Sequence, residues 1–434
     1  MKFLIAALAV TSSLASAQAP DATTAVRCGK LLDVKSGKME PNQVVVVRGG
    51  RIAGIGTQVP NDATVIDLSG QTCLPGLIDV HTHLLQNYEG KLGGDDPNML
   101  LTVAAMGTVR RALLGAAMGR EDLEAGITTV RDLGNSGLNG DVALRDAIRS
   151  GWVKGPRIVA STRALSAAGG QFGNVTPEAQ AIIANEYVVI SGVEEARRAV
   201  RQALYDGADV IKVIVNTGPR VVSLEEMKVI VEEASRVNRK VAAHAIGDLA
   251  TRIAAEAGVA SIEHGYTIPD DVLAMMAQKK IFLVPTDYPP DDYLGFSGET
   301  SEEQKKQSLV GATSFAKNNA ARLQRAMKAG VKIAFGSDEY YQFPGGSTRG
   351  QSSLHTLRAY TSAGMTPIEV IRTATVNAAE LLGMDLRVGA LETGKFADII
   401  AVPGDPLADI RLLERVSFVM KGGEVVRNLR PPAS

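Results

Sequence analysis

The sequence has little excess charge of either sign. Its 434 residues include 46 Lys and Arg against 47 Asp and Glu, so the formal net charge is −1. It also lacks low-complexity segments and blocks of like charge. This balance gives no electrostatic reason to expect nucleic acid or an anionic membrane as a partner. The length suits a large barrel with an appended domain better than a minimal domain.

Long hydrophobic runs are missing as well. The apolar run at residues 3–14 is too short, and too interrupted by Ser and Thr, to span a bilayer. It follows Lys2 and precedes the small residues Ala15–Ala17, which is the arrangement of an export signal. We therefore predict a signal peptide over residues 1–17 and a periplasmic or secreted mature protein. An apolar first strand is the alternative.

Cysteine is scarce too. Only Cys28 and Cys73 are present, and their spacing matches no metal-binding or redox motif. In an oxidising compartment the two could form one disulfide that ties the N-terminal strands to the entrance of the next domain. Two buried free thiols are the other interpretation, and the sequence does not choose between them.

Two similar segments lie at opposite ends of the chain. Residues 44–56 read VVVVRGGRIAGIG, and residues 418–428 read FVMKGGEVVRN. Each pattern predicts a strand, a Gly-Gly turn and a second strand. We therefore expect a small β-sandwich domain built from residues 18–73 and 386–434, with residues 74–385 inserted as a second domain.

The inserted domain alternates short β-prone runs with helical runs. A helix is predicted over residues 192–208, where Ser191 and Glu194 fit a capping box, and another over residues 224–238. The eight strand candidates are GLIDVHTH, TTVRDL, RIVAS, VIKVIV, VAAHA, SIEHG, FLVPT and KIAFGSD. Eight such units predict a (β/α)8 TIM barrel of the α/β class. An open doubly wound sheet is the alternative, but its Gly-rich phosphate-binding turn is absent after the first strand.

Four of the five histidines fall at predicted strand ends. His81 and His83 end the first strand, His244 the fifth and His264 the sixth, while Asp338 ends the eighth. Alternate residues of a strand share a face, so the side chains in the HTH motif point the same way. The carboxyl ends of barrel strands form one ring, where active sites lie. Four imidazoles and a carboxylate suit zinc or another borderline divalent metal. For the HTH motif alone, a hydrogen-bonded pair is the alternative.

The ligands divide into two sets. One metal would take His81, His83 and Asp338, and a second would take His244 and His264. Two dications this close repel each other unless an anion lies between them. Lys212 lies between apolar neighbours in the fourth strand, where burial lowers the pKa of its amine. A neutral amine can add carbon dioxide and become a bridging carbamate. A lysine paired with a buried acid is the alternative.

The set of motifs resembles the amidohydrolase superfamily over nearly the whole mature chain. The matching motifs are LPGLIDVHTHL, GITTVRDLG, GPRIVAS, GADVIKV, VAAHA, SIEHG, FGSD and GALETGKFADIIAV. The resemblance is strongest to the imidazolonepropionase-like group, which includes exported Xaa-Pro and Xaa-Arg dipeptidases and ochratoxin-hydrolysing amidases. It implies two metal ions, expected to be Zn²⁺, bridged by a carboxylated Lys212 and a water or hydroxide. It also implies that Asp338 is both ligand and proton shuttle.

The loops depart from that pattern. Gln171 stands where many relatives carry a histidine, and Ile246 stands where the dipeptidases often carry a tyrosine. These changes leave hydrolysis intact and put dipeptidase specificity in doubt. The polar, Pro-rich segment at residues 286–306 is expected to form a mobile lid or rim. The fifth histidine, His355, lies in a helical run and is expected to be structural or to support a ligand.

Five residues are candidate substrate contacts. Gln171 can donate a hydrogen bond to an oxyanion. Arg220 and Arg349 could each bind a carboxylate through a bidentate fork, against the alternative of surface arginines. Tyr288 and Tyr340 could line an apolar pocket, against the alternative of ordinary packing.

The function expected is hydrolysis of amide bonds in dipeptides or N-acyl amino acids, including ochratoxin-type amides, by an exported binuclear metalloenzyme. Hydrolysis of a cyclic amide or imidazolone ring is the second reading. A non-catalytic metal-binding barrel is the third, although none of the six expected ligands is missing. The expected partners are a small-molecule amide and further copies of the same chain.

Overall fold

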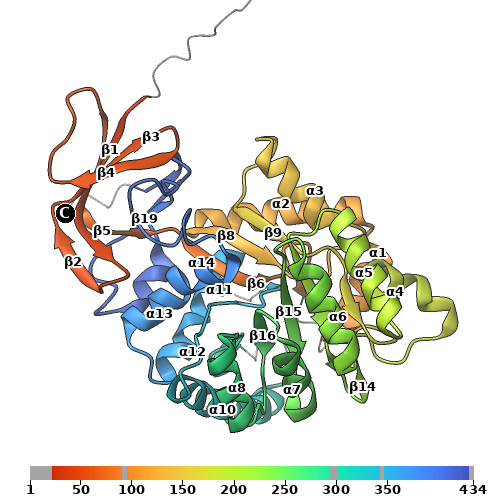
Figure 1. The fold of residues 1–434 in the computed structure, drawn as a ribbon. Coiled ribbons are helices and arrows are strands. Elements are labelled where there is room, and N and C mark those ends of the chain that lie inside the picture. The colour runs from red at the N-terminus through yellow and green to blue at the C-terminus, as the bar shows by residue number, and fades with distance from the viewer. Residues whose placement is uncertain (1–21, 90–94, 293–300, 343–346, 430–434) are drawn as a thin grey trace, which may run out of the picture.

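The computed structural model describes residues 22–89, 95–292, 301–342 and 347–429. The expected signal peptide, residues 1–17, lies outside these ranges. Figure 1 shows two parts: a sheet with strands from both ends of the chain, in red and blue, and a larger part in which helices surround shorter strands.

Strands from both termini form one eight-stranded sheet, in the order β21-β20-β19-β5-β1-β3-β4, with β2 attached to β1. The strands are β1 (Thr24–Asp33), β2 (Lys38–Pro41), β3 (Val44–Arg48), β4 (Arg51–Gly56), β5 (Thr64–Pro75), β19 (Ile399–Val402), β20 (Phe418–Lys421) and β21 (Glu424–Asn428). Both predicted hairpins are confirmed, and all four glycines of their turns have positive φ, which glycine adopts without strain. An additional sheet domain is therefore present, and its packing as a sandwich stays a prediction.

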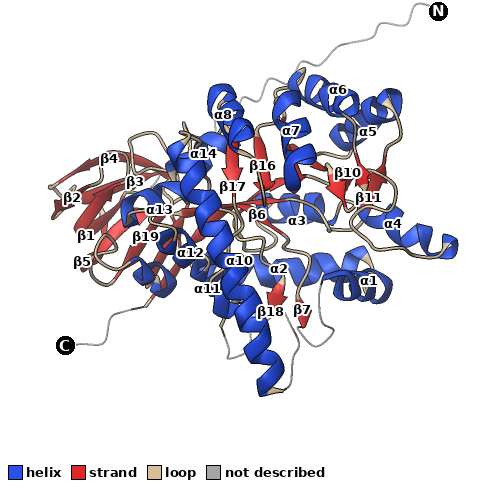
Figure 2. Ribbon diagram, turned by 90° about the horizontal axis from the view of Figure 1, so that it is seen from below, coloured by secondary structure: helices blue, strands red, loops and turns tan. Residues whose placement is uncertain are grey.

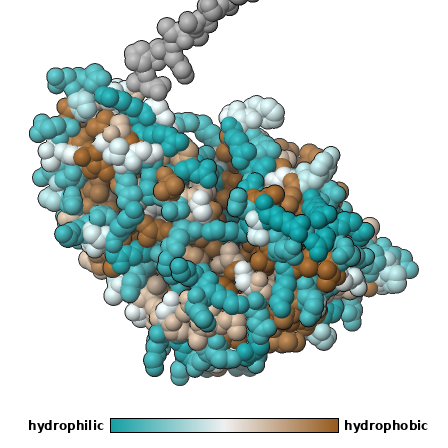
Figure 3. All heavy atoms as spheres, in the orientation of Figure 1, coloured by the Kyte–Doolittle hydropathy of each residue, from teal (hydrophilic) through white to brown (hydrophobic). Residues whose placement is uncertain are grey.

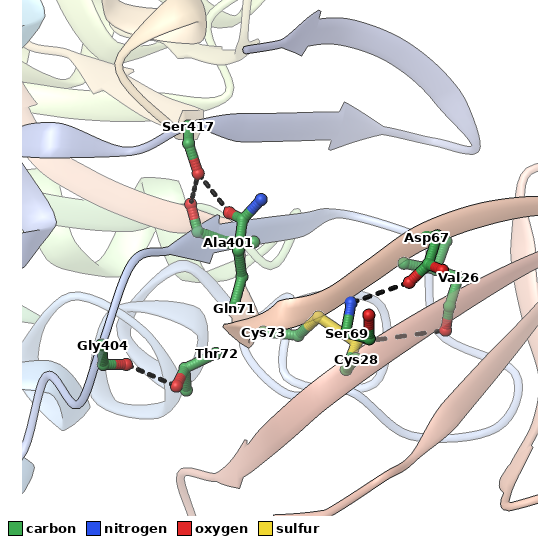
Figure 4. The surroundings of a disulfide bond; sticks show 10 residues. All are labelled: Val26, Cys28, Asp67, Ser69, Gln71, Thr72, Cys73, Ala401, Gly404 and Ser417. Atoms are coloured by element: carbon green, nitrogen blue, oxygen red, sulfur yellow. Dashed lines mark hydrogen bonds between the residues drawn. A yellow bond between two sulfur atoms is a disulfide. The ribbon is translucent and has the colours of Figure 1, made fainter. Parts of the chain in front are cut away.

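The two cysteines form a disulfide bond between neighbouring strands. Cys28 in β1 and Cys73 in β5 have their Cα atoms 5.8 Å apart, and neither side chain is exposed (Figure 4). Of the two interpretations left open by the sequence, the bridge is the one observed. Both cysteines belong to the composite sheet, so the bond joins β1 to β5 within that sheet, and β5 ends at Pro75, just before the strand that carries the HTH motif.

Replacing both cysteines by alanine is expected to lower the free energy of unfolding by about 2–4 kcal/mol, because the bond restricts the unfolded chain. The bridged residues are 45 positions apart. Urea denaturation of the wild type and of Cys28→Ala/Cys73→Ala measures the difference. An unchanged midpoint in the double variant would contradict this account of the bond.

Seven of the eight predicted barrel strands are regular strands. They are β6 (Leu77–Thr82), β8 (Ile127–Asp132), β9 (Arg157–Ala160), β12 (Val210–Ile214), β15 (Lys240–Ala245), β16 (Ser261–His264) and β17 (Phe282–Val284). Strands β6, β8 and β9 pair in parallel, and so do β12, β15, β16 and β17. Two short strands that were not predicted, β10 (Ala164–Ser166) and β11 (Tyr187–Val189), extend the second group.

Backbone contacts join the two groups of strands at both edges: β9 to β12 directly, and β17 to β6 through residues 333–335. The Asp209 amide, just before β12, donates to the Ala160 carbonyl at the end of β9, with 2.8 Å between nitrogen and oxygen. The eighth predicted strand is irregular, yet Ile333 forms a parallel bridge with Leu283 of β17. Further along the same segment, the Phe335 carbonyl accepts from the Val80 amide of β6 at 2.9 Å. The arrangement is therefore that of a TIM-barrel-type fold.

Helices cover the outside of these strands, as Figure 2 shows from below. They are α1 (Asp95–Ala105), α2 (Thr108–Glu124), α3 (Gly140–Arg149), α4 (Gln180–Glu186), α5 (Val193–Tyr205), α6 (Leu224–Ser235), α7 (Gly247–Ala257), α8 (Asp270–Lys279), α10 (Glu302–Lys328), α11 (Arg349–His355), α12 (Leu357–Ser362), α13 (Pro367–Thr373) and α14 (Val376–Leu382). The end of the segment expected to form a lid is the first turn of α10, and residues 293–300 of it lie outside the described ranges.

The predicted capping box at the start of α5 is wrong. The N-cap is Gly192, and no side chain caps the helix. The Ser191 amide instead donates to the carboxylate of Glu195, 2.9 Å away, and Glu226 of α6 accepts from the Gly192 amide at 2.5 Å. The reason is that α5 begins one residue later than the pattern suggested. A full capping box is present one helix further on, between Ser223 and Glu226.

No single helix of the described ranges is long and apolar enough to cross a membrane. One pair, Met99–Ala105 with Thr108–Glu124, passes by length and composition when taken together, but is bent by 118°. On the face drawn in Figure 3, hydrophilic residues predominate and hydrophobic ones form scattered patches.

Candidate metal centre

The register of the parallel strands brings the predicted ligands to one end of the barrel. His81 lies near the carboxyl end of β6, and His83 follows that strand directly. In β15, His244 is paired with Glu263 of β16, so His264 lies one residue further along the same edge. All these positions are at carboxyl ends of strands, where barrel sites are built.

Three ligand atoms converge in a cluster. Oδ1 of Asp338 lies 3.1 Å from Nε2 of His83 and 3.4 Å from Nε2 of His81. Within the described ranges, His81, His83 and Asp338 are the group whose donor atoms all lie within 4.8 Å of one another. This is the set that the sequence assigned to one metal.

The other predicted ligands surround the cluster. The ring centroid of His264 lies 4.6 Å from that of His244 and 5.2 Å from that of His81. Nζ of Lys212 is 3.4 Å from Nε2 of His81, and Lys212 is 2% exposed. The structure therefore places all six predicted ligands in one buried region and puts the lysine amine next to the cluster.

Hydrogen bonds fix the orientation of three rings. Nδ1 of His81 is 2.8 Å from a carboxylate oxygen of Glu263, and Nδ1 of His83 is 2.9 Å from the Gly134 carbonyl. Nδ1 of His264 is 2.7 Å from the hydroxyl of Thr286. When Nδ1 carries the proton and donates it, the lone pair of Nε2 stays available for a metal.

Burial favours the neutral form of His81, His244 and His264. It lowers the pKa of His81, helped by the charge of Lys212, and it lowers the pKa of His264. Burial lowers the pKa of His244 to about 3 and that of Lys212 to about 8. Neutral imidazoles offer lone pairs, and an amine with this pKa is partly uncharged near neutral pH.

Asp338 supplies the negative charge. Its burial raises the pKa, but His81 and His83 lower it by more, so the carboxyl group titrates below its usual range. Imidazole nitrogens around one ionised carboxylate are the donor set of a zinc-type cation, so the residues present fit the metal that the motifs imply.

Strained backbone holds two ligands in place. Asp338 and His264 both have positive φ, 54° and 66°, which L residues seldom adopt. The Asp338 amide donates to the His81 carbonyl at 2.7 Å, and its own carbonyl accepts from the hydroxyl of Tyr288 at 2.8 Å. Strain of this kind persists where the surroundings enforce it, and it is common at functional sites.

Sequence reasoning missed a set of charged residues beneath the ligands. Glu263 accepts from His81 and from the buried guanidinium of Arg131, which also donates to the carbonyl of Val80. Asp79 accepts from the backbone amide and the hydroxyl of Ser337, and burial raises its pKa to about 6. The available signal was the presence of acids within apolar strands, since a buried carboxylate needs partners.

Three of the five predicted substrate contacts lie beside the ligands. Nε2 of Gln171 is 3.5 Å from Nδ1 of His244, and its side-chain oxygen accepts from the hydroxyl of Tyr187 at 3.2 Å. The rings of Tyr340 and His83 are 5.7 Å apart, and Tyr288 holds the carbonyl of Asp338 as described above.

The two arginines both hydrogen-bond to backbone carbonyls of loops, and for Arg349 this occupies the guanidinium that was expected to bind a carboxylate. Arg349 is 5% exposed and donates hydrogen bonds to the hydroxyl of Thr82 and to the carbonyls of His83 and Glu339. Its guanidinium is therefore not available to bind a substrate carboxylate. Arg220 donates to the carbonyls of Ala168 and Phe172, both at 2.7 Å, and so fixes the loop that carries Gln171. Both arginines position the loops of the site.

His355 lies outside the cluster. Its Nδ1 is 2.8 Å from a carboxylate oxygen of Asp292, so it links α11 to the segment that follows β17. This contact agrees with the structural role expected from the sequence.

Comparisons with known proteins extend over both parts of the chain. Residues 72–426 match the family described as "Amidohydrolase family". Ochratoxinase from Aspergillus niger is 34% identical over 384 residues, which cover 82% of this chain and 75% of that protein. An imidazolonepropionase from Symbiobacterium thermophilum is 29% identical over 401 residues, 85% of each chain.

A solved structure gives a similar result. A Xaa-Pro dipeptidase with methionine bound in its active site has a TM-score of 0.78 and 31% identity, and the match covers 93% of this chain and 99% of the other. The similarity thus includes the sheet domain as well as the barrel-type part.

Proposed function

The chain belongs to the amidohydrolase family, and from that premise we propose that it is a binuclear metallohydrolase of dipeptides or N-acyl amino acids. Hydrolysis of amide carbon–nitrogen bonds and dependence on metal are common to the family. The observation that carries the proposal is the convergence of His81, His83 and Asp338 within 4.8 Å, beside the buried amine of Lys212.

The six predicted ligands would hold two divalent cations, with Zn²⁺ as the expected metal. His81, His83 and Asp338 would hold one, His244 and His264 the other, and a carboxylated Lys212 would bridge them. When bound, such ions acidify a water molecule and polarise the scissile carbonyl. The low pKa of Lys212, about 8, supports the carbamate, because only the neutral amine adds carbon dioxide.

Residues of the chain would carry the proton and bind the oxyanion. Asp338 would accept the proton of the attacking water at a carboxylate oxygen and deliver it to the leaving amine; its lowered pKa keeps the carboxylate ionised and so able to accept a proton. The hydroxyl of Tyr288 holds the Asp338 backbone in position. The amide of Gln171 would donate a hydrogen bond to the oxyanion, since it lies beside His244 on a loop fixed by Arg220.

The substrate class rests on the relatives. Two proteins that match most of this chain are named ochratoxinase and Xaa-Pro dipeptidase; the first name refers to ochratoxin and the second to a dipeptide. A second candidate, ring hydrolysis, is favoured by the match to imidazolonepropionase, which covers 85% of both chains. The ochratoxinase match has the higher identity, 34% against 29%.

We further propose export, with cleavage after Ala17, and assembly as a homo-oligomer. The disulfide between Cys28 and Cys73 supports an oxidising compartment. We also propose the division into residues 18–73 with 386–434 and residues 74–385, although β5 of the composite sheet continues to Pro75, two residues past that boundary. Amino-terminal sequencing that began at Met1 in exported material would overturn the signal peptide.

The function is tested by a substrate panel with the purified metal-loaded enzyme. Dipeptides, N-acyl amino acids including an ochratoxin-type amide, and imidazolonepropionate are compared by kcat/KM. The proposal expects the highest values among the linear amides. Preference for imidazolonepropionate would replace it with ring hydrolysis, and turnover of none of them would contradict both.

A further inference from the structure

A cavity of about 590 Å³ lies at the opposite mouth of the barrel-type part from the metal centre. Its lining includes Arg157, the first residue of β9, together with Asp209 and Arg239, which immediately precede β12 and β15. The predicted ligands, in contrast, lie at the carboxyl ends of their strands. Phe396 and Lys421 close the cavity from the side of the sheet domain.

The cavity has an excess of positive charge. Its cationic lining residues are Arg145, Arg149, Arg157, Arg239, Arg387 and Lys421. Four of these arginines pair with three carboxylates, those of Asp146, Asp209 and Asp398. The remaining two, Arg387 and Lys421, form no ion pair with a carboxylate of the described residues. Glu424 also acts on Lys421, together with Asp398, so six cations face four anions and the local excess is two positive charges.

The cationic groups are held in place. Nζ of Lys421 donates to the Gly155 carbonyl at 2.6 Å, and burial lowers the pKa of this amine to about 8. The guanidinium of Arg157 lies over the ring of Phe396, 4.4 Å from its centroid, while it also pairs with Asp398. Leu382 and Met384 add an apolar wall. The amine of Lys421 is partly buried, so its charged form is costly, and a bound anion would lower that cost.

We propose that this cavity binds a small oxyanion of at least two negative charges, either a phosphate or a dicarboxylate, between the barrel-type part and the sheet domain. Arg387 and Lys421 are its principal contacts, because neither forms an ion pair with a carboxylate of the described residues. An excess of two charges is more than a monocarboxylate would neutralise. Since the ligand touches residues of both parts, its binding stabilises their junction.

The test is calorimetric titration of the metal-loaded enzyme with inorganic phosphate, with succinate and with acetate, at equal ionic strength. Phosphate can also reach a metal centre, so the wild type is compared with Arg387→Ala and Lys421→Met. Arg198→Ala serves as the matched control, since Arg198 is exposed on α5 and pairs with Glu195 of the same helix. Arg387 is exposed, so Arg387→Ala is expected to fold and still tests the proposal if Lys421→Met does not fold.

We expect saturable binding of phosphate or succinate, weakened about tenfold or more in Arg387→Ala because a charge-assisted contact is lost. Arg198→Ala should bind as the wild type does, and acetate should not compete. Binding of phosphate alone or of succinate alone identifies the oxyanion. Equal affinity of Arg387→Ala and wild type for both ions, or no saturable binding of either, would overturn the proposal.

Discussion

Asp338→Asn is expected to lower the turnover number by a factor of about 10²–10⁴, which is the usual contribution of a general acid–base group. The amide keeps an oxygen that can reach the positions held by Oδ1, 3.1 Å from His83 and 3.4 Å from His81. It cannot accept a proton from water. Metal content should therefore fall less than turnover, and a KM close to that of the wild type is expected.

The matched control is Asp292→Asn. This substitution makes the same chemical change in a buried carboxylate that contacts His355 and lies outside the ligand cluster. Its turnover should remain close to that of the wild type, while its melting temperature falls. Steady-state kinetics, elemental analysis and thermal unfolding of both variants are measured together. Equal turnover in Asp338→Asn and Asp292→Asn would show that Asp338 carries no proton.

Lys212→Ala is expected to abolish measurable hydrolysis and to lower the bound metal, because no anion would remain between the two cations. Lys212 lies in β12 with its Nζ 3.4 Å from Nε2 of His81. Truncation opens a space next to the ligands, so short carboxylic acids such as acetate or propionate should enter it and restore part of the activity. Rates are measured against acid concentration at fixed pH and ionic strength.

Lys240→Ala is the control for that rescue. Lys240 begins the neighbouring strand β15, and its amine donates to the carbonyls of Glu380 and Leu381 at the other end of the barrel-type part. Its loss should affect stability and should leave the rate independent of added acid. Wild-type turnover in Lys212→Ala would exclude the bridging carbamate.

The sequence was most informative where chemistry depends on position along a strand. His81, His83, His244 and His264 were each found at the end of a β-prone run, and parallel strands bring such ends together. The composite sheet was predicted for a similar reason, because two Gly-Gly hairpin patterns are local signals. Local patterns of this kind do not require knowledge of distant contacts.

Roles that depend on distant contacts were not predictable. Arg349 resembled a substrate-binding arginine in the sequence, but it is buried against Thr82 and His83, more than 260 positions away. The same limit applies to Glu263, whose partner His81 is 182 positions away. The disulfide was left open for that reason too, since the pairing of Cys28 with Cys73 depends on the parallel register of β1 and β5.

The measurement that tests the central claim most directly is a metal titration of the depleted enzyme with Zn²⁺, in which bound metal and amide hydrolysis are followed together. The account predicts that activity rises to a plateau at two equivalents per chain. It also predicts that His81→Ala and His83→Ala stay folded and bind less metal, with almost no activity. Full activity of the metal-free enzyme, or near-normal turnover in either histidine variant, would contradict the placement of the active site at this cluster.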